Sequence, residues 1–164
     1  MTAPVVVFAV GNPSRGDDAI GPVLFERLLV WLDQEGLAPG FELIEDFQLQ
    51  IEHALDLRGR QLALFIDAGE GTPAPYSFRQ VQAVAGITHT THELPPEAVL
   101  QVYRQTEGGE PPISFVLCVR GESFELGEPL SVAAQQRVEQ AVIMLHDLCR
   151  DIRKEAWLAR VTDD

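Results

Sequence analysis

The chain has few cysteines, few basic residues and no long apolar run. Its 164 residues include two cysteines, Cys118 and Cys149, which lack the paired spacing of a zinc site or a redox motif. We therefore expect both thiols to behave as small buried hydrophobic groups. The formal net charge is −13, from 12 basic and 25 acidic side chains. That balance disfavours nucleic acid as a partner, because such binding depends on neutralising phosphates.

No apolar run reaches the roughly 20 residues that cross a bilayer, and the N-terminal residues do not resemble a secretory signal. We therefore expect a cytoplasmic protein with no membrane partner. The length and the 46% apolar content fit one domain over residues 1–164. Roughly the last ten residues, which follow a charged stretch, are expected to form a tail that is either frayed or in contact with a partner.

A glycine-rich turn with two adjacent carboxylates follows the first apolar segment. Residues 5–10 are typical of a buried strand, and residues 11–21 then read GNPSRGDDAIG. This run lacks the Gly-Lys-Ser/Thr ending of a phosphate loop and the spacing of a dinucleotide fingerprint. Asp17 and Asp18 would repel phosphate and attract a cation, so a nucleotide-binding module ranks last among the alternatives. Helix capping explains one of these aspartates but not both.

Strand-like and helix-like segments alternate along the chain. We predict strands over 5–10, 41–45, 62–66, 76–84 and 113–119, and helices over 20–34, 51–57, 95–104 and from 132 onward. The pattern predicts an α/β fold, a three-layer sandwich in which a mostly parallel twisted sheet of about five strands has helices on both faces. Because right-handed crossovers bring the carboxyl ends of parallel strands to one edge, we expect Asp18 and Asp67 to meet there.

Two histidines, His89 and His92, lie in a polar loop over 86–93 that can reach the same edge. Two carboxylates and one imidazole suit a divalent transition metal. No Ser/His/Asp or Cys/His arrangement for nucleophilic catalysis can be assembled from this chain.

Several acidic and histidine residues also have ordinary structural explanations. Asp67 alone could simply form a turn, and Asp17 could be a solvated carboxylate in the first turn of a helix. Asp46 could mark a solvated strand end, and His53 and His146 could be surface or helix-packing residues. The expected convergence of Asp18, Asp67 and a histidine is what favours a functional site.

Three segments together resemble the [NiFe]-hydrogenase maturation endopeptidases, over nearly the whole chain. They are the run 11–21, the apolar strand ending in Asp67-Ala68, and His92-Glu93-Leu94 followed by Ala98-Val99-Leu100. The resemblance implies a hydrolase that removes the C-terminal extension of the hydrogenase large-subunit precursor once nickel is loaded. It also implies that Asp18, Asp67 and His92 are the metal-binding and catalytic residues.

The resemblance implies that the precursor itself supplies the nickel, and that cadmium or zinc can occupy the same site. Residues 46–50, Asp-Phe-Gln-Leu-Gln, lack the glycines that many members have there and resemble the branch serving bidirectional, NAD-coupled hydrogenases. Asp18 is shorter than the glutamate of some members, which would draw a metal closer to the helix. Two alternatives stay open: His89 could replace His92, and Asp17 could act as a general base or orient His92. We expect a monomer, and a chaperone that binds the metallated precursor without cutting it is the alternative function.

Overall fold

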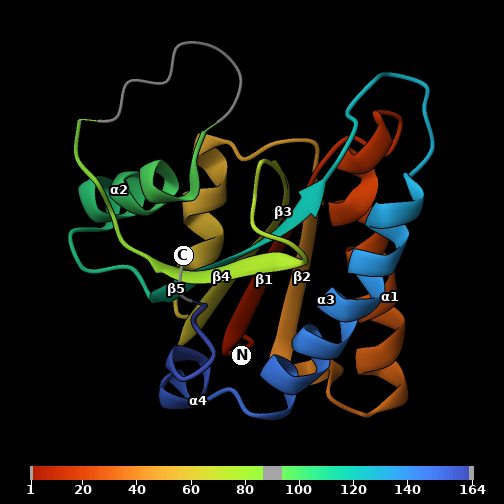
Figure 1. The fold of residues 1–164 in the computed structure, drawn as a ribbon. Helices are drawn as coiled ribbons and strands as arrows, with labels where there is room; N and C mark the ends of the chain where they lie inside the picture. Colours follow the sequence, from red (N-terminus) through yellow and green to blue (C-terminus); the bar gives the residue numbers. More distant parts are fainter. Residues whose placement is uncertain (1, 87–93, 163–164) are drawn as a thin grey trace.

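Five strands form one open sheet in the computed structural model, which describes residues 2–86 and 94–162 (Figure 1). They are β1 (Val5–Val10), β2 (Phe41–Asp46), β3 (Leu62–Glu70), β4 (Tyr76–Val81) and β5 (Ile113–Gly121). Their order is β2-β1-β3-β5-β4, with β4 as an antiparallel edge strand beside parallel neighbours. The predicted mostly parallel α/β sheet is therefore confirmed for the described residues.

Helices cover both faces of this sheet, which confirms the three layers (Figure 1). One face packs against α1 (Ile20–Gln34), α3 (Val132–Arg150) and α4 (Lys154–Leu158), and the other against the 3₁₀ helix η3 (Ile51–Leu57) and α2 (Pro96–Glu107). Every residue of β1 is buried, and its side chains alternate between the two cores. A strand buried on both faces must be apolar at every position, which explains the unbroken run over 5–10.

Strand β3 is longer than its sequence pattern indicated. We expected an apolar strand over 62–66 that ends at Asp67, but its pairing with β5 continues to Glu70. Its pairing with β1 does stop at Ile66. Asp67 therefore lies inside β3, one residue beyond the last recorded pair between β3 and β1, at the carboxyl edge of the sheet.

The prediction of a frayed C-terminal tail was wrong for the described residues up to Thr162. Residues Lys154–Leu158 form α4, and the Trp157 side chain is 0% exposed. The indole N–H of Trp157 donates to the backbone oxygens of Leu148 and Asp151, both at 2.9 Å. The charged residues around Trp157 conceal this anchor in the sequence, because one buried aromatic leaves no periodic pattern. Of the helices in the described residues, none has the length and apolar content of a membrane span.

Candidate functional site: two carboxylates at the edge of the sheet

The glycine-rich run forms a tight turn between β1 and α1. Its residues Gly16–Ala19 make a 3₁₀ turn, η1, which leads directly into the helix. Gly11 has a φ of 151°, and a Cβ atom there would overlap the backbone oxygen of Asp18. Glycine is therefore needed at this position for conformation as well as for space.

Asp18 holds the turn together and faces a cavity. Its Oδ2 accepts a hydrogen bond from the backbone N–H of Asn12 at 2.6 Å. The N-cap position of α1 is Ala19, so helix capping does not explain Asp18. The bond to Asn12 closes the turn and fixes the orientation of the carboxylate, which is partly buried.

Asp17 points into a different environment, although it is the neighbouring residue. Its side chain is 0% exposed and accepts four hydrogen bonds from the segment after β5. The donors are the backbone N–H groups of Glu122 (2.7 Å), Ser123 (3.3 Å) and Ser131 (2.7 Å) and the Ser131 hydroxyl (2.7 Å). The Ser131 hydroxyl oxygen also accepts from Ala134 N, so Ser131 is the N-cap of α3.

The prediction of a solvated carboxylate at Asp17 was therefore wrong. Burial works to raise the pKa of Asp17, but the hydrogen bonds from Ser131, Glu122 and Ser123 outweigh it and lower the pKa. Because hydrogen-bond donors surround this buried carboxylate, we assign Asp17 a structural role. Asp17 ties η1 to the start of α3, more than a hundred residues away in the sequence.

Asp67 comes to the same edge of the sheet from β3. Its Oδ1 accepts a hydrogen bond from the backbone N–H of Ala68 at 2.7 Å, and its side chain is partly buried. Its register partner on β5 is Cys118. Asp67 lies one residue beyond the last recorded β1–β3 pair, and its side chain lines the same cavity as Val10 at the end of β1.

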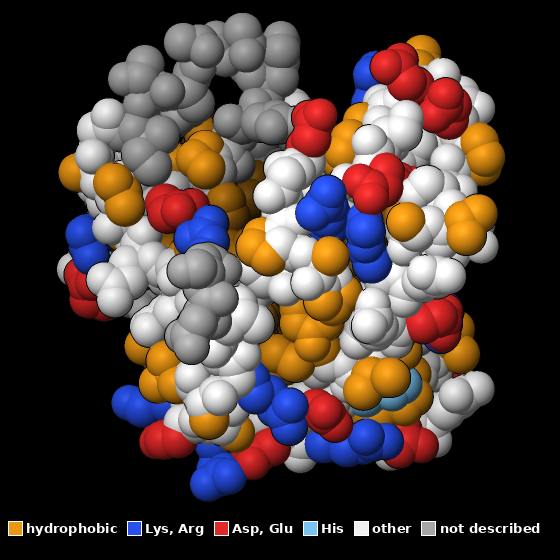
Figure 2. All heavy atoms as spheres, viewed as in Figure 1, with side chains coloured by type: hydrophobic (Ala, Val, Ile, Leu, Met, Phe, Trp, Pro, Cys, Tyr) orange, Lys and Arg blue, Asp and Glu red, His pale blue; other side chains and the backbone are white. Residues whose placement is uncertain are grey.

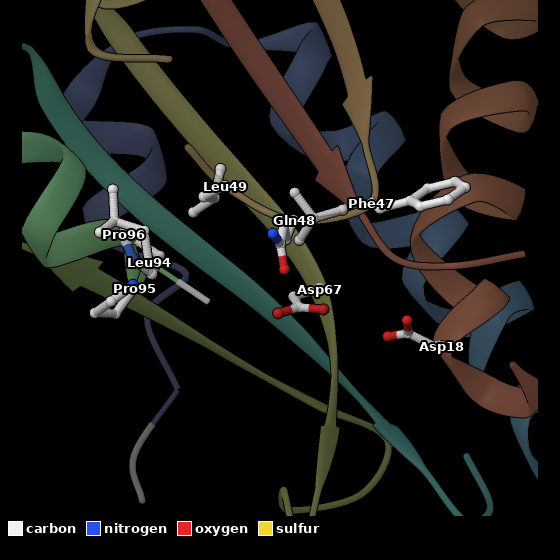
Figure 3. A pocket seen from close by; sticks show the side chains of 9 residues that line it. Asp18, Phe47, Gln48, Leu49, Asp67, Leu94, Pro95 and Pro96 are labelled. Carbon is white, nitrogen blue, oxygen red and sulfur yellow. The ribbon is translucent and has the colours of Figure 1, made fainter. Parts of the chain in front are cut away.

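Asp18 and Asp67 line one cavity of about 250 Å³, which we call the carboxylate cavity (Figure 3). Its other lining residues are Val10 at the end of β1, Phe47, Gln48 and Leu49 after β2, and Leu94, Pro95 and Pro96 at the start of α2. Figure 3 shows the Gln48 side chain pointing toward Asp67. The structure thus brings together two of the three residues predicted to bind a metal.

His92, the third predicted ligand, and His89, its alternative, lie outside the described residues. Within 2–86 and 94–162, no group of three His, Cys, Asp or Glu side chains could hold a metal ion. The described part of the predicted ligand set is therefore a pair of carboxylates. These are oxygen donors suited to a divalent cation that brings other ligands with it.

Comparison with solved structures finds the same fold in hydrogenase maturation proteases. The [NiFe] hydrogenase maturation protease HycI from Thermococcus kodakarensis superposes with a TM-score of 0.64 at 23% identity, over 92% of this chain and 94% of that one. The hydrogenase maturating endopeptidase HybD from E. coli superposes with a TM-score of 0.65 at 21% identity, over 89% of this chain and 91% of that one. The chain has the fold of the hydrogenase maturation proteases.

The solution structure of the E. coli endopeptidase HycI agrees, with a TM-score of 0.60 at 18% identity over 90% of this chain and 91% of that one. No family model and no curated protein sequence matches the chain. These similarities support the resemblance noted in the sequence but do not distinguish among branches, so the bidirectional branch stays a prediction.

In this maturation-protease fold, one wall of the carboxylate cavity is held by a buried histidine. The His53 Nδ1 accepts a hydrogen bond from the backbone N–H of Gln50 at 2.8 Å, and its Nε2 lies 3.5 Å from Asp46 Oδ2. Its ring packs edge-on against Phe8, with 5.5 Å between ring centroids. Asp46 Oδ1 accepts from Phe47 N at 2.7 Å. His53 is thus a packing residue, as expected, and it also fixes both ends of the wall over 46–50.

Both cysteines lie in the part of the chain that the structure describes, and neither thiol has a lowered pKa. Burial raises the pKa of Cys149 to about 12. Burial also raises the pKa of Cys118, opposed by a 3.2 Å hydrogen bond with Thr72 and reinforced by the charge of Asp67. Cys149 is buried as expected, whereas Cys118 is only partly buried. His146 stacks on Trp31 with 3.9 Å between ring centroids, which confirms the expected helix-packing role.

Proposed function

We propose that this protein is an endopeptidase that removes the C-terminal extension of the nickel-loaded [NiFe]-hydrogenase large-subunit precursor. The observation that supports this most is the pair of carboxylates, Asp18 and Asp67, on one cavity of a maturation-protease fold. The named activity of the compared proteases, together with two carboxylates on one cavity, favours metal-assisted hydrolysis over the other hydrolytic mechanisms.

The nickel belongs to the substrate, and the protein contributes ligands to it. Asp18 and Asp67 would bind the nickel of the precursor, with His92 as the third protein ligand. A metal held in this way polarises the scissile carbonyl or lowers the pKa of a bound water to about 7. A precursor without nickel would bring no electrophile, so the protein would leave it uncut.

The hydrogen bonds of the two carboxylates favour this role because they fix the ligands before the substrate arrives. Asp18 is held by Asn12 N and Asp67 by Ala68 N, on a turn and a strand that are both anchored in the core. Ligands that are already ordered lose less conformational entropy on binding. Asp18 and Asp67 can therefore bind the metal without rearranging.

The proposal is tested by replacing Asp18, Asp67 and His92 by Ala, one at a time, and incubating each variant with the nickel-loaded precursor. We expect folded proteins, judged by circular dichroism and thermal unfolding, that no longer shorten the precursor in mass spectra. Asp151→Ala, which removes a carboxylate at the far end of α3, should cut like the unmodified protein. Normal cleavage by all three site variants would refute the proposal. A precursor that stays intact but bound to the unmodified protein would favour the chaperone alternative.

A further inference from the structure

A second hollow adjoins the carboxylate cavity and shares Asp18 with it. It has a volume of about 400 Å³, and its lining includes Asn12, Arg15, Asp46 and Gln50. Asp18, Phe47 and Gln48 border both spaces, whereas Asp67 borders only the first. We call this second space the Arg15 hollow. A polypeptide lying across Asp18 would occupy both spaces, one on each side of this carboxylate.

Arg15 is exceptional among the arginines of the protein. All 11 arginines fall within the described residues, and 10 of them form an ion pair with a described carboxylate. Among the arginines in that part of the chain, Arg15 alone has no such partner. Figure 2 shows the general rule on one face, where basic side chains lie next to acidic ones. With a net charge of −13, the chain does not leave Arg15 unpaired for lack of acids.

The acidic side chains of the same hollow already have other partners. Asp18 accepts from Asn12 N, and Asp46 accepts from Phe47 N and faces His53. The backbone of Arg15 is fixed within the turn, because its N–H donates to Asn12 O at 3.1 Å and its oxygen accepts from Asp18 N at 3.0 Å. A rigid backbone therefore presents an exposed guanidinium whose five donors are available to a ligand.

We propose that Arg15 binds a carboxylate of the precursor polypeptide in the Arg15 hollow and so sets where the substrate chain lies relative to Asp18. This rests on the proposed function and adds a substrate-binding residue to it. A guanidinium binds a carboxylate through two parallel hydrogen bonds, which fix orientation as well as position. The amide side chains of Gln48 and Gln50, which line the same hollow, can donate to backbone oxygens of the same segment.

The carboxylate has two sources in a polypeptide substrate, an Asp or Glu side chain near the cleaved bond and the terminal carboxylate of the extension. Both present the same group to Arg15. Changing the acidic residues near the cleavage point one at a time to Asn or Gln shows whether Arg15 binds one of their side chains. A precursor lengthened by a few neutral residues at its C-terminus displaces the terminal carboxylate and identifies that source.

The test compares Arg15→Ala, Arg15→Lys and Arg15→Glu with Arg153→Ala in steady-state cleavage of the nickel-loaded precursor. Arg153 is exposed, pairs with Asp151 and lies beyond the far end of α3, so its replacement removes the same charge away from both spaces. Loss of one charged, bidentate contact should raise KM about tenfold in Arg15→Ala with kcat nearly unchanged. The rise in KM should be smaller for Arg15→Lys and larger for Arg15→Glu.

A binding measurement separates this inference from the proposed function. In an Asp67→Ala background, which is expected not to cut, Arg15→Ala should weaken precursor binding about tenfold by calorimetry. A precursor that lacks the recognised carboxylate should bind equally to both proteins. If the unmodified protein cuts but Arg15→Ala has the KM and affinity of Arg153→Ala, the inference is wrong and the proposed function stands. A fall in kcat with unchanged KM would also refute it, because Arg15 would then act on Asp18.

Discussion

Asp17 and Asp18 are adjacent and chemically identical, yet their replacements should have opposite consequences. Asp17 is 0% exposed and accepts four hydrogen bonds, three of them at 2.7 Å. Asp18 is partly buried and accepts one, from Asn12 N at 2.6 Å. We expect Asp17 to matter for stability and Asp18 for chemistry, and replacement of each by Ala tests this contrast.

The expected loss of stability follows from the number of hydrogen bonds that each replacement removes. At about 1 kcal/mol for each net hydrogen bond, and with the 3.3 Å bond from Ser123 taken as weak, Asp17→Ala should lower the free energy of unfolding by about 3 kcal/mol. Asp18→Ala should lower it by about 1 kcal/mol or less. For a chain of this length the larger loss corresponds to a fall in Tm of roughly 10 °C. Asp17→Asn should be nearly as harmful, because its NH₂ group would face N–H donors.

Urea unfolding followed by circular dichroism measures both variants under one set of conditions. The slope of the free energy against urea should be unchanged, so that the shift in midpoint reports stability alone. Precursor cleavage by the same samples, at a temperature where Asp17→Ala is folded, completes the comparison. Equal losses of stability in the two variants, or a loss below about 1 kcal/mol for Asp17→Ala, would refute the argument from the hydrogen bonds.

Three further predictions concern regions away from the cavity. Trp157→Ala should lower the free energy of unfolding by about 3–5 kcal/mol in urea, because the side chain is fully buried; a loss below about 1 kcal/mol would indicate a frayed segment after all. Cys149, whose pKa burial raises to about 12, should resist a thiol reagent at neutral pH until the protein is unfolded. Hydrogen bonds from Arg153 lower the pKa of Asp151 to about 2. Its stabilising contribution is therefore present above the ordinary pKa of 3.8 and is lost as the pH falls toward 2. In an NMR titration, Arg153→Ala should return the Asp151 midpoint toward 3.8, and an unchanged midpoint would contradict the assignment.

The sheet and the meeting of two carboxylates could be predicted because each depends on local patterns and on chirality. The apolar runs over 5–10 and 62–66 identify buried parallel strands. Right-handed crossovers then bring Asp18 and Asp67 to one edge, whatever the details of the loops. The cavity they line bears out that reasoning for both residues.

Features that depend on distant partners could not be predicted in the same way. The donors to Asp17 lie 105 to 114 residues further along the chain, so nothing near it in the sequence distinguishes it from Asp18. The extension of β3 past Ile66 depends on the length of β5, and the role of His53 depends on a wall folded back onto it. Trp157 stands alone among charged residues, and only the packed core reveals its burial.

The central claim, that the nickel of the substrate completes a site built on Asp18 and Asp67, is tested most directly by mass spectrometry of the large-subunit precursor. The precursor is incubated with the unmodified protein in nickel-loaded and nickel-free forms. The account predicts loss of the C-terminal extension from the loaded form and an intact nickel-free form. Cleavage of both forms at the same rate, or of neither, would contradict it.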